Sequence, residues 1–277
     1  MRLPPWHAHP DVWLLFGSII AFYIIACRRH LRDTGEATPR RRMRLFVTGV
    51  AVLWIGADWP IHDLAERYLY SVHMVQHLMF TLVAAPILIA GMPPWMLRRM
   101  LRPKAVKRVF RFLTRPLVAL ILFNSVLLFA HWPAVVTVSV HSEWFHFGLH
   151  TALTLSALVV WWPIMSPLPE LPALPAPGQL IYLFLQSLAP TIPASFLTFG
   201  THPLYPVYAT FPRIWGISVL TDQLLAGLIM KLVGGAILWG FIAVVFFRWY
   251  AEEKRDGWDA SKYRNVEHEI RSELNHR

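Results

Sequence analysis

The sequence contains a single cysteine, Cys27, and only 15% of its residues are charged. One cysteine forms neither an internal disulfide nor a CxxC metal site, so any metal chemistry must use His, Met, Asp or Glu. Soluble domains carry roughly 25% charged residues. No nucleotide-binding motif occurs, and the Gly234-Gly235 pair inside an apolar run is typical of helix packing. One membrane domain is therefore favoured over two soluble ones.

The sequence contains long runs of apolar residues. The chain has 277 residues, of which 56% are hydrophobic, and its mean hydropathy is +0.44. A run of about 17 residues or more crosses the hydrocarbon core of a bilayer as a helix. We therefore expect an all-α, polytopic membrane helix bundle with seven transmembrane helices, at residues 12–27, 45–57, 71–91, 116–131, 144–165, 178–199 and 219–247. The first run lacks the pattern of a cleaved signal peptide and is expected to be retained.

Basic residues indicate how the spans are oriented. Residues 28–44, 98–115 and 248–277 contain seven, eight and seven Lys/Arg, which is 22 of the 26 in the chain. These segments alternate with the other loops, and the positive-inside rule makes their side cytoplasmic. The sequence thus predicts an outer N-terminus and an odd number of spans. The membrane domain is expected at 1–247 and a charged, helical cytoplasmic tail at 248–277.

Histidines are concentrated on the opposite, outer side. That side is poor in cations and holds ten of the 13 histidines: His7, His9, His62, His73, His77, His131, His141, His146, His150 and His202. A surface rich in imidazole and carboxylate suits a metal cation. Isolated histidines at an interface usually hydrogen-bond only to headgroups or loops, and this is the favoured interpretation for His7, His9, His141 and His202.

Two histidine pairs have helical spacing. His73 and His77 are four residues apart at the start of the third span, and His146 and His150 are four apart at the start of the fifth. Side chains at i and i+4 share one face of a helix, so both imidazoles of a pair can reach one ion. Polar side chains within spans are costly and usually face the interior of the bundle.

Three further residues complete the predicted metal ligands. His131 ends the fourth span on the same side, and in the seventh span Asp222, Ala226 and Met230 share one face that leads inward. A thioether beside imidazole and carboxylate is compatible with copper. The expected metal residues are His73, His77, His131, His146, His150, Asp222 and Met230.

The order of these motifs resembles a known family. The run His73-Met-Val-Gln-His77 is followed by Pro86, Gly91 and Pro93, then by His131-Trp-Pro133, Trp161-Trp162-Pro163, and Asp222-Gln223 with Met230. Together they resemble the CtaG-type, multi-span assembly factors of caa-type cytochrome c oxidases, over roughly residues 12–247. Lys231 departs from the pattern, in which an aromatic or apolar residue follows the methionine.

The resemblance implies a multi-pass protein of the bacterial cytoplasmic (inner) membrane that is not an enzyme. Its cofactor would be copper, and its partners the lipid bilayer, subunits of a haem–copper cytochrome c oxidase and periplasmic copper chaperones, with no nucleic acid. The leading hypothesis is a copper-handling assembly factor. Two alternatives stay open: a haem-binding membrane redox protein with His77 and His150 as axial ligands, and a copper permease with Met230 and Lys231 on its path.

Overall fold

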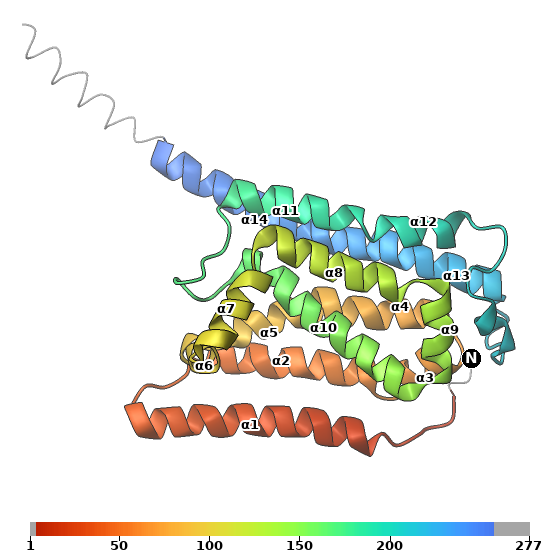
Figure 1. Cartoon of the computed structure of the whole chain (residues 1–277), viewed down its shortest axis with the longest axis horizontal. Helices are drawn as coiled ribbons and strands as arrows, with labels where there is room; N and C mark the ends of the chain where they lie inside the picture. Colours follow the sequence, from red (N-terminus) through yellow and green to blue (C-terminus); the bar gives the residue numbers. More distant parts are fainter. Residues whose placement is uncertain (1–3, 258–277) are drawn as a thin grey trace, which may run out of the picture.

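The computed structural model describes residues 4–257, and all regular structure in this range is helical. The helices lie alongside one another in a bundle (Figure 1). In chain order the elements are α1 (Pro10–Thr34), α2 (Arg40–Ala57), α3 (Ile61–Arg67), α4 (Tyr70–Leu78), η1 (Met79–Ala84), α5 (Ala85–Gly91), α6 (Pro94–Met100), α7 (Lys104–Leu113), α8 (Pro116–Ala130), α9 (Pro133–His141), α10 (Glu143–Met165), α11 (Ala176–Leu188), α12 (Thr191–Phe199), η2 (Pro206–Thr210), α13 (Val219–Leu228), η3 (Ile229–Val233) and α14 (Gly234–Gly257).

The membrane fold predicted from the apolar runs is confirmed. Five helical segments are long and apolar enough to cross a bilayer, at Pro10–Thr34, Tyr70–Gly91, Glu143–Met165, Ala176–Phe199 and Val219–Arg255. Two bent helix pairs raise the number to as many as seven. One pair is α2 with α3, at 41°, and the other is α7 with α8, at 77°. The seven predicted runs coincide with these segments.

The fourth predicted span begins at the sharp bend between α7 and α8. Its apolar helix, α8, has 15 residues and is roughly 22 Å long, which is less than the hydrocarbon thickness. The preceding α7 carries basic residues on one side and Val106, Val109 and Phe112 on another. Such an amphipathic helix lies along a membrane surface. Pro116 at the first position of α8 fixes the turn between the two.

The sixth predicted span is interrupted rather than continuous. It consists of α11 and α12, which are separated by a turn at Ala189 and Pro190. Pro190 has no backbone N–H to continue the helix, so the break falls there. The helical tail predicted after residue 247 is found as far as Gly257, and residues 258–277 lie outside the described range.

The two histidine pairs and the described basic segments lie at opposite ends of the bundle. The loop between α1 and α2, helices α6 and α7, and the end of α14 lie at one end, whereas α3 and α9 cover the other (Figure 1). The expected outward orientation of the histidine end stays a prediction.

Close helix packing fixes η1 and α5 against α2. Three glycines form the contact: Gly49 faces Leu88, Gly56 faces Phe80, and Gly91 faces the backbone of Phe46 so closely that a Cβ atom has no room. The hydroxyl of Tyr23 in α1 also donates to the Gly91 carbonyl, at 3.0 Å. The first histidine pair lies on α4, which continues directly into this closely packed segment.

Candidate metal centre

Four imidazoles from two helices meet at one end of the bundle. His73 and His77 lie one turn apart on α4, and His146 and His150 one turn apart on α10. The Nε2 atoms of His146 and His150 are 2.7 Å apart, and those of His77 and His150 are 3.2 Å apart. The two sequence-predicted pairs thus form one cluster.

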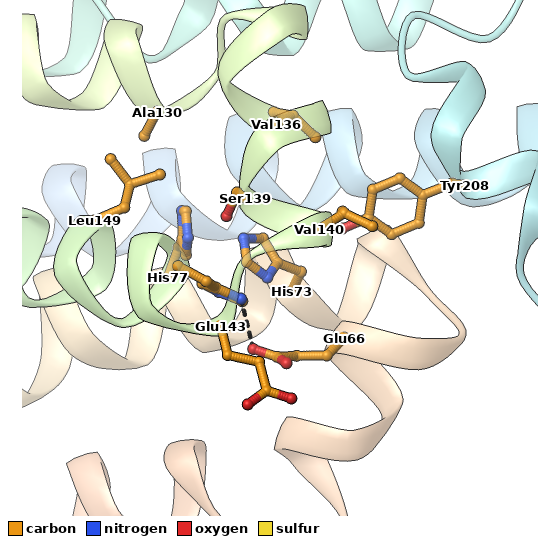
Figure 2. A pocket seen from close by; sticks show the side chains of 11 residues that line it. Glu66, His73, His77, Ala130, Val136, Ser139, Val140, Glu143, Leu149 and Tyr208 are labelled. Carbon is orange, nitrogen blue, oxygen red and sulfur yellow. Dashed lines mark ion pairs between the residues drawn. The ribbon is translucent and has the colours of Figure 1, made fainter.

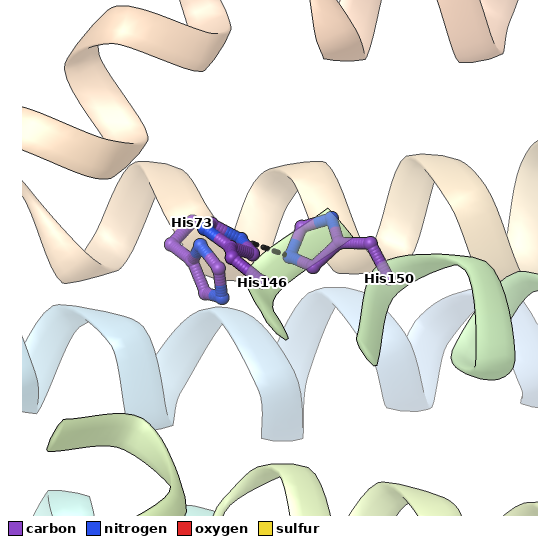
Figure 3. A group of neighbouring side chains, drawn as sticks. All are labelled: His73, His146 and His150. Atoms are coloured by element: carbon purple, nitrogen blue, oxygen red, sulfur yellow. Dashed lines mark hydrogen bonds between the residues drawn. The ribbon is translucent and has the colours of Figure 1, made fainter. Parts of the chain in front are cut away.

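Three of these residues have the spacing that one metal ion requires. His73, His146 and His150 each offer a ring nitrogen, and these nitrogens lie within 4.8 Å of one another. Figure 3 shows the three rings side by side between the helices. With metal–nitrogen bonds of about 2 Å, the ligand atoms of a shared ion lie roughly 3–3.5 Å apart. A small side-chain adjustment therefore brings all three nitrogens onto one ion.

A carboxylate behind the cluster orients one of its ligands. Glu66, from α3, lies 2.6 Å from Nδ1 of His146, the ion pair that the dashed line marks in Figure 2. It also lies 3.6 Å from Nε2 of His62. With Nδ1–H directed to the carboxylate, Nε2 of His146 keeps its lone pair on the side of His150. Metal-ligating histidines almost always have such a second partner, which fixes the tautomer and raises the basicity of the ligand.

The cluster borders a small cavity near the end of the bundle. Its volume is about 40 Å³, and its polar lining comes from Glu66, His73, His77, Ser139, Glu143 and His146 (Figure 2). Tyr208 from η2 and Val136 from α9 close it on the apolar side. A cavity of this size holds an ion with a few waters. Imidazole suits copper, zinc, iron and nickel.

His131 lies beside the cluster but belongs to a different environment. Its ring centroid is 5.6 Å from that of His77. Its Nδ1–H donates to the carbonyl of Leu127 at 2.7 Å, whereas its Nε2 is buried without a hydrogen-bond partner. It is one of the predicted residues that the fold brings close to the pairs.

Asp222 positions the start of α4, and its expected role as a metal ligand stays a prediction. Its two carboxylate oxygens accept the backbone N–H groups of Tyr70 and Ser71, at 2.8 and 2.9 Å. These are the first residues of α4, where N–H groups lack partners inside the helix. A carboxylate at that position stabilises the helix start. Asp222 is fully buried, and it fixes α4 rather than facing the imidazoles.

Met230 and the isolated histidines lie away from the cluster. Met230 is buried in η3 among Tyr70, Met74 and Ala226. His7 and His9 pair with Asp63 of α3, at 3.3 and 2.9 Å. The remaining two of the four isolated histidines bond locally, His141 to the Thr137 carbonyl and His202 to Thr201.

Sequence reasoning missed Glu66, Asp63 and Met74. Glu66 is four residues after His62, a spacing that predicts a shared helix face, but its contact with His146 crosses 80 residues of chain. Met74 lies beside His73 on α4, off the face of the histidine pair. It is buried instead against α13 and η3.

The fold and this site define a polytopic helical membrane protein with a histidine cluster at one end of its bundle. The sequence profile of a family described as cytochrome c oxidase caa3 assembly factors matches residues 21–252, which is most of the chain. The chain belongs to this family, as the order of its motifs predicted.

Two curated proteins are similar to the chain, an uncharacterised protein of Mycobacterium bovis and one of Mycobacterium tuberculosis. Each is 22% identical over an alignment of 274 positions, and the alignment includes 86% of this chain. The chain spans only 38% of the length of these relatives. No solved structure matches it.

Proposed function

We propose that this chain holds a copper ion between His73, His146 and His150 and delivers it to a haem–copper cytochrome c oxidase during assembly. The observation that carries the proposal is the spacing of the three ring nitrogens, within 4.8 Å of one another. Membership of an oxidase assembly family selects copper among the metals that imidazole accepts. Hand-over would proceed by ligand exchange, without catalytic turnover.

The proposal places the cluster on the outer, periplasmic side of a bacterial cytoplasmic membrane. The loop between α1 and α2, helices α6 and α7 and the basic end of α14 lie at the opposite end of the bundle (Figure 1), and the positive-inside rule assigns that end to the cytoplasm. Copper would then reach the cluster from the periplasm, where a copper chaperone is a suitable donor. His77, at 3.2 Å from His150, supplies a fourth imidazole for ligand exchange.

The haem alternative finds no support in the distance between its two candidate ligands. Axial ligation places iron between two nitrogens, which are then about 4 Å apart and separated by the macrocycle. The Nε2 atoms of His77 and His150 are 3.2 Å apart and in hydrogen-bond contact. The described cavities bordering His77, of about 40 and 60 Å³, are too small for a porphyrin.

A copper permease is a second candidate, because His77 borders both of these cavities. Uptake of copper into vesicles that contain the purified protein separates the two functions. An assembly factor binds copper but gives no sustained uptake.

The test of the proposed site is copper analysis of the purified, copper-loaded protein. We expect His146→Ala/His150→Ala to lose the imidazole-bound copper, and His141→Ala, which removes an exposed histidine outside the cluster, to retain it. In a strain that lacks the gene, His146→Ala/His150→Ala should fail to restore oxidase activity, whereas His141→Ala should restore it. Full copper binding by the double variant would refute the site.

A further inference from the structure

A second cavity lies next to the cluster, farther from the histidine end. Its volume is about 60 Å³, and side chains from α4, η1, α8, α11, α12 and η3 border it. It shares only His77 with the lining of the first cavity. His77 thus borders both cavities.

Two π-helical segments border this second cavity. Thr81 comes from η1, and Met230 and Lys231 come from η3. π-Helical turns are rare and occur mainly at functional sites, since the additional residue turns side chains away from the regular helical face. Two such segments on neighbouring helices at one cavity indicate a site that the fold maintains at some cost.

His131 offers this cavity a ligand atom that nothing in the described chain uses. Its Nδ1–H donates to the Leu127 carbonyl, which leaves the lone pair on Nε2. That Nε2 is fully buried and has no hydrogen-bond partner, although the residue borders the cavity. A buried acceptor without a partner is costly, and a histidine tied to a backbone carbonyl through its other nitrogen is the usual form of a metal ligand.

Two methionines border the same cavity. Met74 and Met230 are 1% and 7% exposed. Thioether sulfur is a soft ligand that selects Cu(I) over harder cations. Each methionine by itself is ordinary core packing, but here both lie at the cavity that His131, with its unpartnered Nε2, also borders.

The charges around the cavity exclude the hard divalent cations. No aspartate or glutamate is among its lining residues within 4–257, and its nearest full charge is the cation of Lys231. The Lys231 ammonium lies 5.5 Å from the ring of Phe199. Calcium and magnesium require oxygen ligands, usually carboxylates. A singly charged, soft ion bound by neutral ligands suits this environment best.

We infer that the second cavity is a Cu(I) site whose donors are His77, His131, Met74 and Met230. The inference rests on the proposed copper function and adds to it a second, sulfur-containing site that shares His77 with the imidazole cluster. The chain would then hold two copper ions in different ligand environments. Because His77 borders both sites, it can serve as a ligand to the ion in either one while copper passes between them.

The test is Cu(I) titration of the full-length, detergent-purified protein against a competing chelator, combined with X-ray absorption at the copper edge. We expect two Cu(I) per chain and both nitrogen and sulfur neighbours. Met74→Leu/Met230→Leu should lose one Cu(I) and all sulfur neighbours. Met79→Leu, which replaces a methionine outside both cavity linings, should retain both ions. Leucine and methionine are close in volume, so these variants should fold.

The outcomes separate the two sites. His146→Ala/His150→Ala should lose the sulfur-free ion and retain sulfur neighbours around the remaining one. One Cu(I) with nitrogen neighbours alone in the wild type would overturn the second site and leave the first intact. One Cu(I) with sulfur neighbours, unaffected by the double histidine variant, would overturn the first site and support the second. A protein that binds no copper refutes both.

Discussion

The Glu66 carboxylate lies 2.6 Å from Nδ1 of His146, although the two residues belong to different helices, α3 and α10. Glu66 is thereby connected to the imidazole cluster without being one of its ligands. The contact fixes which ring nitrogen of His146 faces His150 and keeps that nitrogen free to bind an ion.

Replacing this carboxylate should weaken copper binding without removing a ligand. For Glu66→Gln we expect about a 10- to 100-fold loss of affinity at the imidazole site, the usual effect of losing such a partner. Competition titration with a chelator measures it. Glu143→Gln is the matched control, since Glu143 borders the same cavity but is exposed and does not contact His146. Equal losses in both variants would assign the effect to surface charge.

Asp222→Ala should destabilise the protein while leaving its copper content unchanged. The variant leaves the buried N–H groups of Tyr70 and Ser71 without an acceptor, which costs about 1–3 kcal/mol per group. Thermal unfolding in detergent measures the loss. Asp222→Asn keeps one oxygen and should lose less. If a folded Asp222→Asn protein lost a copper ion, the carboxylate would be a ligand after all.

Gly227→Ala should weaken the packing of α13 against α12. A Cβ atom there would lie 2.7 Å from the Ala194 carbonyl and 2.9 Å from Cβ of Leu197. Both are too close, so the helices must separate, at a cost of about 1–3 kcal/mol. Unfolding midpoints measure the change. Gly240→Ala is the control, because a Cβ at that position meets no atom within 4 Å. A similar midpoint for both would show that α12 shifts freely.

The orientation can be tested with the single native cysteine removed by Cys27→Ser. On that background, Thr201→Cys lies in the loop after α12 and Lys104→Cys at the start of α7, both exposed. A membrane-impermeant maleimide applied to intact spheroplasts should label the first and spare the second. The reverse labelling would place the histidine cluster in the cytoplasm.

The ion pair between Arg98 and Glu170 should contribute stability only above acidic pH. The two side chains are 2.8 Å apart at the basic end of the bundle. The hydrogen bond from Arg98 lowers the pKa of Glu170 below its ordinary value of 4.5. A lowered carboxylate pKa means that the contribution is present above 4.5 and is lost as the pH falls below it.

Glu170→Gln is the variant that tests this pair. It should lower the unfolding midpoint slightly at pH 7, because the pair is exposed and screened. The difference from the wild type should shrink as the pH falls below 4.5, and a difference that did not depend on pH would point to the packing of the loop rather than to charge.

The membrane fold was predictable because apolar runs and basic loops are local properties of the sequence. Helical spacing also placed His73 with His77 and His146 with His150 on the correct faces. What local patterns lack is the relation between helices. Whether α4 faces α10 depends on packing among distant residues, as in the contact between Gly91 and Phe46.

The contacts at the site that the sequence did not indicate have the same origin. Asp222 shares a helical face with Met230, but its partners are backbone groups of α4, which carry no sequence signature. Met74 is off the face of the histidine pair, and its position beside a second cavity depends on where η3 lies. Lys231, the departure from the family pattern, lies at that cavity with its cation over Phe199.

The four imidazoles come from only two helices, so a movement of one helix displaces two of them together. Trp161 donates its ring N–H to the Thr81 carbonyl at 2.7 Å, and this hydrogen bond connects α10 to η1. His150 and His146 lie about 16 and 22 Å along α10 from Trp161, near the N-terminal end of the helix, which carries the exposed Trp144. A partner that pulled this end aside would draw both α10 donors away from His73 at once. Binding and release of an ion would then depend on this one movement of α10.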